Sequence, residues 1–186
     1  MKRLLSILLI SVTLSGCSIS ENDINQVIGL RTKLQNGDQC SFDTCITVDY
    51  GESLSSFELS CKIDDQQNWE ITVIRPQTIA GITCRIAGEK GQLTFDDKAV
   101  AFEMIADGQI TPISAPWLVM KALAGGYINS TVVKNDGLVV RIDDSYSDFL
   151  FSVDLWLNEN NIPYFAEIVW QGKRIVSMDI NNFTIV

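Results

Sequence analysis

The chain is an acidic protein of 186 residues whose composition, 46% hydrophobic and 20% charged, is that of one ordinary globular domain. Its 23 acidic residues outnumber its 14 basic ones and give a formal net charge of −9. This charge argues against nucleic acid and anionic lipid surfaces as partners, because both attract Lys and Arg. The chain has no histidine, so most Ser/His and Cys/His catalytic schemes are excluded, since they need a base that works near neutral pH.

Residues 1–16 have the organisation of a secretory signal peptide. Two basic residues follow the first Met, residues 4–14 form an apolar segment, and the small residues Ser15 and Gly16 suit a signal peptidase. The apolar segment is shorter than the roughly 20 residues of a membrane-spanning helix, and hydroxyl side chains interrupt it. We therefore expect a cleaved leader.

The sequence Leu14-Ser15-Gly16-Cys17 resembles the lipobox of bacterial lipoproteins at every position. The resemblance implies cleavage before Cys17 and acylation of its sulfur and its new amino group, so Cys17 is the expected lipidation site. Several acyl chains anchor a protein firmly, because each buried CH₂ contributes about 0.8 kcal/mol. The alternative is an ordinary secreted protein with a cysteine here by chance.

Cleavage at this site would leave a tether, residues 17–22, and a single domain, residues 23–186. It would remove two basic residues and no acidic one, which lowers the formal net charge from −9 to −11. Ser18 beside the acylated cysteine resembles the outer-membrane default of a two-membrane cell, and in a one-membrane cell the protein would sit on the outer face of the cytoplasmic membrane. We expect a monomer of the cell envelope that is bound to the membrane through its lipid anchor.

Helical periodicity opens the mature sequence and alternation then replaces it. Residues 22–36 place apolar side chains at helical spacing and predict one amphipathic helix, which Gly37 ends. A second helix is predicted over residues 114–125, because Ser114 can cap it and a proline in its first turn costs no hydrogen bond. Strands are predicted over residues 42–50, 57–63, 69–73, 81–87, 91–95, 99–105, 127–133, 138–142, 149–157, 164–170 and 175–183.

These elements predict a mainly β protein with two helices. Short turns between successive strands imply antiparallel pairing, and a sheet of about eleven strands curls or closes. We expect a strongly curved antiparallel sheet, an incomplete β-barrel, whose concave apolar face is plugged by the helices. Eight apolar residues should face the helices: Ile46, Val48, Phe57, Leu59, Ile71, Val73, Ile82 and Ile86.

The stretch Arg75-Pro76-Gln77-Thr78-Ile79-Ala80-Gly81-Ile82, together with the proline-flanked start of the second helix at residues 111–117, resembles the LolA/LolB-like superfamily of bacterial lipoproteins and lipid carriers. The resemblance covers roughly residues 40–186, with Asp97 where the lipoprotein branch has glycine. It implies a half-open barrel around an apolar cavity and a role in moving or shielding acyl chains, lipoproteins or other hydrophobic molecules. The basic latch residue and the exposed delivery loop of the carriers have no assigned counterpart here, so cargo transfer is not part of the expectation.

Four cysteines follow the lipobox: Cys40, Cys45, Cys61 and Cys84. Export permits disulfides among them, with three pairings, and small buried thiols are the alternative. Long spacings and the lack of histidine argue against a metal site. Matching the apolar faces of the first two strands pairs Ile46 with Cys61 and turns Cys45 to the opposite face, so we expect no Cys45–Cys61 bond.

The sequence offers no catalytic constellation, and we expect no enzyme, cofactor or metal. The acidic doublets Asp64-Asp65, Asp96-Asp97 and Asp143-Asp144 fall at predicted strand ends, where such residues favour turns.

Large aromatic and sulfur side chains gather on the second helix and on nearby strands. They either fill the core or line an adaptable pocket for a lipid or other hydrophobic ligand. A hydrophobic-ligand-binding lipoprotein is the main hypothesis, and a tethered interaction or structural module with a fully packed core is the alternative. The candidate pocket residues are Phe102, Met104, Trp117, Met120, Phe149, Phe151 and Trp156.

Overall fold

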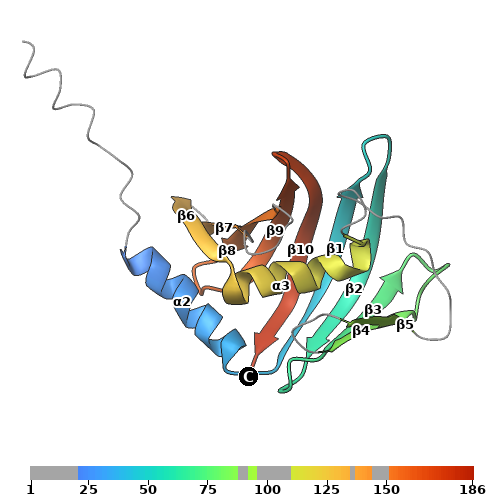
Figure 1. Ribbon diagram of the computed structural model, residues 1–186, viewed down its shortest axis with the longest axis horizontal. Helices are drawn as coiled ribbons and strands as arrows, with labels where there is room; N and C mark the ends of the chain where they lie inside the picture. The colour runs from blue at the N-terminus through green and yellow to red at the C-terminus, as the bar shows by residue number, and fades with distance from the viewer. Residues whose placement is uncertain (1–20, 88–91, 96–109, 135–136, 144–150) are drawn as a thin grey trace, which may run out of the picture.

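The computed structural model describes residues 21–87, 92–95, 110–134, 137–143 and 151–186, which form a curved sheet with helices on one side (Figure 1). The helical elements are α2 (Glu21–Gln35), the short 3-10 helix η1 (Pro112–Ser114) and α3 (Ala115–Gly125). The strands are β1 (Cys40–Asp49), β2 (Leu54–Ile63), β3 (Trp69–Arg75), β4 (Thr83–Ala87), β5 (Gln92–Phe95), β6 (Tyr127–Lys134), β7 (Gly137–Asp143), β8 (Phe151–Leu157), β9 (Pro163–Trp170) and β10 (Lys173–Ile185). The strand predicted over residues 99–105 lies outside the described residues.

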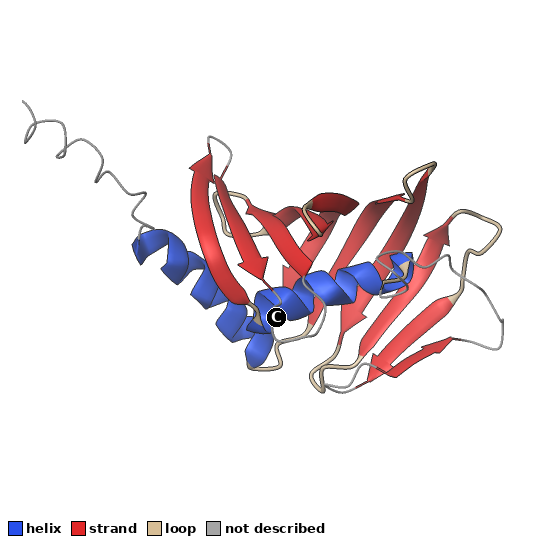
Figure 2. Ribbon diagram, turned by 45° about the horizontal axis from the view of Figure 1, so that its top comes forward, coloured by secondary structure: helices blue, strands red, loops and turns tan. Residues whose placement is uncertain are grey.

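The ten described strands form one antiparallel sheet in the order β5-β4-β3-β2-β1-β10-β9-β8-β7-β6. Two meanders, β1 to β5 and β6 to β10, join where β1 pairs with β10 near the middle of the sheet. Strands β5 and β6 are the edges of the described sheet, which curves around α3 without closing (Figure 2). The predicted fold class, an incomplete barrel with helices on its concave apolar face, is confirmed.

The alternation of the strands buries one face of the sheet beneath the helices. Of the eight residues predicted to face the helices, seven are at most 3% exposed, and Phe57 is half-buried against the same core. From the second meander, Val140, Val153 and Leu155 join this core with no exposed surface. Each fully buried aliphatic side chain of this size contributes about 1.5–3 kcal/mol.

The β1–β2 hairpin has a different register from the one predicted. Cys61 lies opposite Phe42, not opposite Ile46, which is a displacement of four residues. The reason is that the turn is short, residues 50–53, and β2 begins already at Leu54. The serines that follow Leu54 interrupt the apolar alternation, so the sequence predicts a later start for this strand. Because the displacement is an even number, every side chain keeps its predicted face.

The apolar bend between β3 and β4 continues the core. Gly81, with a φ of 84°, donates its N–H to the carbonyl of Val73 at 2.8 Å, and Val73 donates to the carbonyl of Ile82 at 2.9 Å. Ile82 is buried and Ile79 packs partly against the core. The bend is apolar because its side chains cover the concave face beyond the last residue of β3.

Close local contacts fix both ends of helix α3. Before it, Thr111 and Ser114 form a capping box around η1, and the Ser114 side chain, predicted to cap α3, makes no cap bond to that helix. At its end, a Cβ on Gly126 would lie 2.5 Å from Cγ2 of Ile142, so only glycine allows the chain to approach β7 this closely. The helix can therefore pass directly into β6.

Candidate functional site

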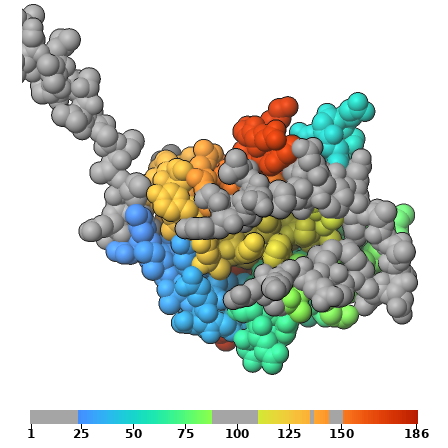
Figure 3. All heavy atoms as spheres, in the orientation of Figure 1, coloured from blue at the N-terminus to red at the C-terminus, as the bar shows by residue number. Residues whose placement is uncertain are grey.

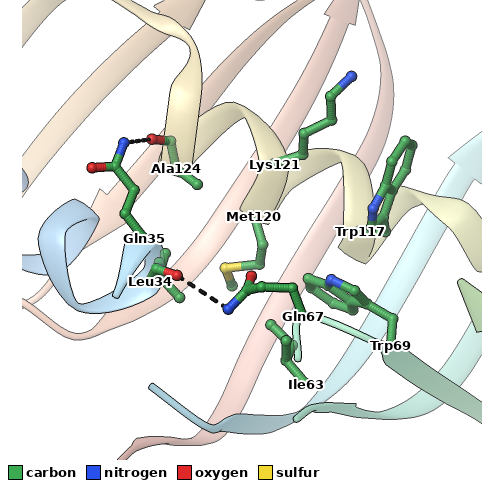
Figure 4. Close-up of a pocket in the computed structure, with 9 residues that line it drawn as sticks. All are labelled: Leu34, Gln35, Ile63, Gln67, Trp69, Trp117, Met120, Lys121 and Ala124. Atoms are coloured by element: carbon green, nitrogen blue, oxygen red, sulfur yellow. Dashed lines mark hydrogen bonds between the residues drawn. The ribbon is translucent and has the colours of Figure 1, made fainter. Parts of the chain in front are cut away.

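A pocket of about 440 Å³ opens where α3, the last turn of α2 and the β2–β3 turn meet (Figure 4). Its volume falls within the range of about 300–1,000 Å³ that is usual for small-molecule sites. Nine described residues line it: Leu34, Gln35, Ile63, Gln67, Trp69, Trp117, Met120, Lys121 and Ala124.

Helix α3 supplies one wall through its periodicity. Trp117, Met120, Lys121 and Ala124 are spaced three, four and seven residues from the first, so they share one face of the helix. Met120 is buried, whereas Trp117 is half-buried and packs against the edge of the core. This wall combines a flat aromatic ring with a flexible thioether, a pair that adapts to ligand shape.

The strands supply the facing wall. Ile63 is the last residue of β2 and Trp69 is the first of β3. Both therefore lie beside the β2–β3 turn, at the end of these strands that borders the pocket. The Trp69 ring meets Phe42 edge-on at a centroid distance of 6.4 Å, which fixes the indole against the core. Figure 4 shows that Trp69 and Trp117 reach the pocket from different elements.

The β2–β3 turn is built around the carboxylate of Asp64. Its Oδ1 accepts the backbone N–H groups of Gln66 at 2.9 Å and Asn68 at 2.8 Å, and its Oδ2 accepts the Asn68 amide at 3.0 Å. The hydrogen bond from the Asn68 side chain is the main reason that the pKa of Asp64 lies below its ordinary value. The turn holds Gln67 at a φ of 61°, and its amide donates to the carbonyl of Leu34 at 3.3 Å, which ties β2–β3 to α2.

Two side chains of α2 bind the carboxyl end of α3, and the two helices lie side by side in Figure 3. Arg31 donates from Nε to the carbonyl of Leu123 at 2.7 Å and from Nη2 to that of Gly126 at 2.8 Å. Gln35 donates to the carbonyl of Ala124 at 2.6 Å. Helices end with unsatisfied carbonyls, so these bonds cap α3 and also fix the angle between the two helical walls. Burial lowers the pKa of Arg31, which remains a cation.

One charged side chain lines the pocket. Lys121 is the only ionisable residue among the nine that line it, and its Nζ lies 5.2 Å from the centroid of the Trp117 ring. In Figure 4 this ammonium lies at the far side of the group from Ile63 and Leu34. The pocket is therefore apolar at one side and cationic at its rim.

The structure separates the sequence-predicted pocket residues into three groups. Trp117 and Met120 line the pocket. Phe151 is buried in the core, and Trp156 lies on the opposite face of the sheet, where its ring meets Phe165 edge-on at 5.0 Å. Three lie outside the described residues: Phe102, Met104 and Phe149.

Seven lining residues were not predicted as site residues. The spacing of Lys121 and Ala124 from Trp117 could have signalled a shared helical face. The residues from α2, β2, the turn and β3 give no such signal, because their meeting depends on how the helices pack. These seven are Leu34, Gln35, Ile63, Gln67, Trp69, Lys121 and Ala124.

All four described thiols are free. Cys40, Cys61 and Cys84 are buried, and Cys45 lies half-buried on the opposite face, paired across the strands with Glu58 and Asp179. Cys45 and Cys61 thus face opposite sides of the sheet, as the alternation predicts.

The acidic doublets occupy turns and strand ends where the structure describes them. Asp64 organises the β2–β3 turn, and the Asp143 carboxylate accepts a hydrogen bond from the Asn129 amide at 2.7 Å. Asp96, Asp97 and Asp144 lie outside the described residues. Within the described ranges, His, Cys, Asp and Glu side chains form no group of three that could hold a metal ion. A search of the same ranges finds no helix with the length and apolar character needed to cross a membrane.

Comparison with known proteins gives matches at the level of structure. No family model matches the chain, and no curated protein matches its sequence. Matching solved structures include an uncharacterized conserved protein from Thermus thermophilus (TM-score 0.46, 8% identity, 88% of this chain and 87% of that one). Two others are a LolA superfamily protein from Nitrosomonas europaea (TM-score 0.41, 12% identity, 91% and 94%) and a DUF1329 family protein from Desulfovibrio piger (TM-score 0.42, 6% identity, 89% and 92%).

With TM-scores below 0.5 and identities of 12% or less, these three likenesses carry no argument about a ligand or partner of this chain. The LolA-like fold that the sequence predicts is found among the solved structures similar to this chain.

Proposed function

We propose that this protein is a membrane-tethered lipoprotein that binds a hydrophobic ligand in the pocket between α2, α3 and the β2–β3 turn. The observation that carries the proposal is the apolar opening of about 440 Å³ with Trp69 and Trp117 in facing walls. Aromatic rings offer large apolar area at little entropic cost, and Met120 in the same lining can adjust to an acyl chain. The proposed role is binding, without catalysis.

The pocket walls are held by specific bonds from separate elements. The bonds of Arg31, Gln35 and Gln67 connect α2 with α3 and with the β2–β3 turn. A wall fixed in this way loses little conformational entropy when a ligand enters, which favours binding. This arrangement supports a ligand site in preference to an incidental surface hollow.

The tether rests on the resemblance of residues 14–17 to a lipobox, which lies outside the described residues. Helix α2 begins at Glu21, so residues 17–20 would connect the lipidated Cys17 to the folded domain. At 1.5 Å per residue, the 15 residues of α2 span about 22 Å between the start of the helix and the pocket at its last turn. The ligand would therefore be held close to the membrane without lying in it.

Native mass spectrometry of the full chain purified from membranes tests this function. We expect a co-purified hydrophobic molecule that is lost in Ala124→Trp, because the added indole fills the pocket. Ala87→Trp is the matched control, since Ala87 is exposed on β4 and lies outside the pocket lining. Absence of any bound molecule in the parent, or equal occupancy in both variants, would contradict the proposal.

A second candidate is a tethered interaction module, favoured by β6, which is an edge strand of the sheet as far as the structure describes it. Tyr127, Val132 and Val133 are 60%, 53% and 66% exposed on this strand, and such an edge can pair with another chain. A pocket that stays empty in the parent protein would favour this candidate.

A further inference from the structure

We infer that the end of β10 is a binding site for an extended segment of a partner protein, which adds to the sheet as a strand beside Phe183 and Ile185. The site is another groove, of about 730 Å³, between α2, the β8–β9 turn and the last residues of β10. Its two long walls, α2 and the end of β10, converge near the point marked C in Figure 1. The described lining shares no residue with the pocket around Trp117, so the inference stands apart from the function proposed above.

The backbone of β10 has a free side where β9 ends. Strand β9 begins at Pro163, and its last pair with β10 is Phe165 with Asp179. Strand β10 itself continues to Ile185 and stays paired with β1 as far as that residue. Among the described residues, none pairs with residues 180–185 on the β9 side. This part of a central strand therefore has the hydrogen-bonding character of a sheet edge.

The alternation of the backbone indicates which groups face the groove. Gln39 and Val186 exchange both of their backbone hydrogen bonds, so the N–H and C=O of Val186 point to β1. Because such groups alternate sides along a strand, the N–H and C=O of Ile185 and the C=O of Phe183 point away from β1, toward the groove that both residues line. These are the groups that bind an added strand.

The walls of the groove are fixed before a partner arrives. The Phe183 ring stacks on Phe42 with centroids 6.0 Å apart, which holds the end of β10 against the core. Oδ1 of Asn158 accepts the backbone N–H groups of Asn160 at 2.9 Å and Ile162 at 3.1 Å, which shapes the β8–β9 turn. A strand edge held in this way loses little conformational entropy on binding.

The lining suits a peptide better than an acyl chain. It includes four carboxamide side chains, Asn25 and Gln26 on α2 and Asn160 and Asn161 in the turn. Each carboxamide can donate and accept hydrogen bonds, as a peptide group does. A bound peptide can therefore satisfy these groups, whereas an acyl chain offers them no partner.

A glycine in the middle of α2 leaves room in the groove. Gly29 lines it, and a Cβ added there would meet no described atom within 4 Å beyond the adjoining backbone of the helix. Glycine is unfavourable in a helix interior, and no close packing in the described structure requires it here. Close approach of a ligand to the backbone is another setting that favours glycine. Gly29 therefore supports occupation of the groove by a partner.

Peptide binding measured by fluorescence anisotropy tests the inference. The probes are fluorescein-labelled hexapeptides from a synthetic array, in which apolar and polar residues alternate, and the full chain is titrated into them. For a peptide that binds, a second version carries N-methyl groups on every other amide, and a third carries them on the remaining amides. Since only one edge of an added strand meets β10, one version should bind about tenfold more weakly and the other as the unmethylated peptide does.

Gly29→Trp should weaken binding by about tenfold or more, because the indole takes the place of the peptide. Gly125→Trp is the matched control, since Gly125 is also in a helix, a Cβ there would also meet open space, and it lies outside the groove lining. Ala124→Trp, which fills the hydrophobic pocket, should leave peptide binding unchanged. Failure of the pocket and failure of the groove are therefore separate results.

Amide exchange locates the bound peptide. Exchange of the Ile185 amide should slow when the peptide binds, whereas that of Gln39, which already donates to Val186, should not change. Failure of the whole array to bind, equal effects of the two methylation patterns, or unchanged binding in Gly29→Trp would overturn the inference. A slowly exchanging Ile185 amide in the free chain would overturn it too, because another part of this chain would then already cover the edge.

Discussion

Burial separates the thiols of this protein into two kinds. Cys40, Cys61 and Cys84 lie in the core, and burial raises the pKa of Cys40 and of Cys84 to about 12. Burial also raises the pKa of Cys61 well above its ordinary value, with Asp43 and the other two core thiols adding to the effect. Cys45 is half-buried on the outer face, and its pKa is raised first by burial and then by Asp179 and Glu58.

These shifts predict a loss of stability in alkali. The ordinary pKa of the thiol is 9.0, and Cys84 titrates near 12 in the folded chain, so above pH 9 the unfolded chain releases its proton first. The contribution is complete below pH 9 and is lost as the pH rises from 9 toward 12. Under reducing conditions, urea denaturation at pH 8, 10 and 11 should show a shallower decline for Cys84→Ala than for the parent.

Cys45→Ala is the control for this prediction, because that thiol is the least buried of the four and its shift is smaller. It should decline with pH much as the parent does. Identical pH profiles for Cys84→Ala and the parent would show that the core thiol does not contribute.

At the scale of elements, the joint between α2 and α3 holds the pocket in shape. Arg31 serves two carbonyls at the end of α3 with one planar guanidinium, and this fork has a geometry that an ammonium cannot reproduce. The bonds satisfy groups that the helix itself leaves unpaired. Loss of the fork should therefore loosen the end of α3 before it affects the sheet.

Arg31→Lys should destabilise the protein by about 1–3 kcal/mol, because at least one hydrogen bond from a charged donor is lost at a partly buried site. Urea denaturation measures the cost, and amide exchange of residues 123–126 should become faster. Arg75→Lys is the matched control: Arg75 pairs with Glu58 at 3.1 Å, and both side chains are largely exposed. That change should cost at most about 0.5 kcal/mol. Equal costs for the two variants would mean that Arg31 is not a cap.

Alternation made the elements predictable, since period two places one face of each strand against the core. It did not fix which residues lie opposite each other, because the predicted register and the observed one for Cys61 differ by an even number and bury the same side chains. The pocket was predicted only on α3, at Trp117 and Met120, and the helical spacing of Lys121 and Ala124 could have extended that prediction. Leu34, Ile63 and Trp69 reach it through contacts between distant segments, and local pattern carries no information about these.

At the scale of the whole molecule, the proposed anchor is the feature that sets location. Cys17→Ser should release the protein from the membrane fraction or leave the uncleaved precursor, because the serine hydroxyl cannot take the place of the acylated sulfur. Fractionation followed by mass measurement decides this, with Cys45→Ser as the control that stays anchored. A mature-sized Cys17→Ser protein that resists detergent-free washing would show that something else holds it.

The pairing of β1 with β10 joins two segments that lie far apart in the sequence. The Thr44 hydroxyl donates to the carbonyl of Asp179, 135 residues away, and Gln39 and Val186 exchange both backbone hydrogen bonds. The central seam of the sheet therefore has the largest loop to close, and such long-range pairing is slow. Until β10 has left the ribosome or the export channel, β1 lacks the partner on one of its sides. A chain threaded through a membrane pore is thus kept from its native state by its own topology until β10 has emerged.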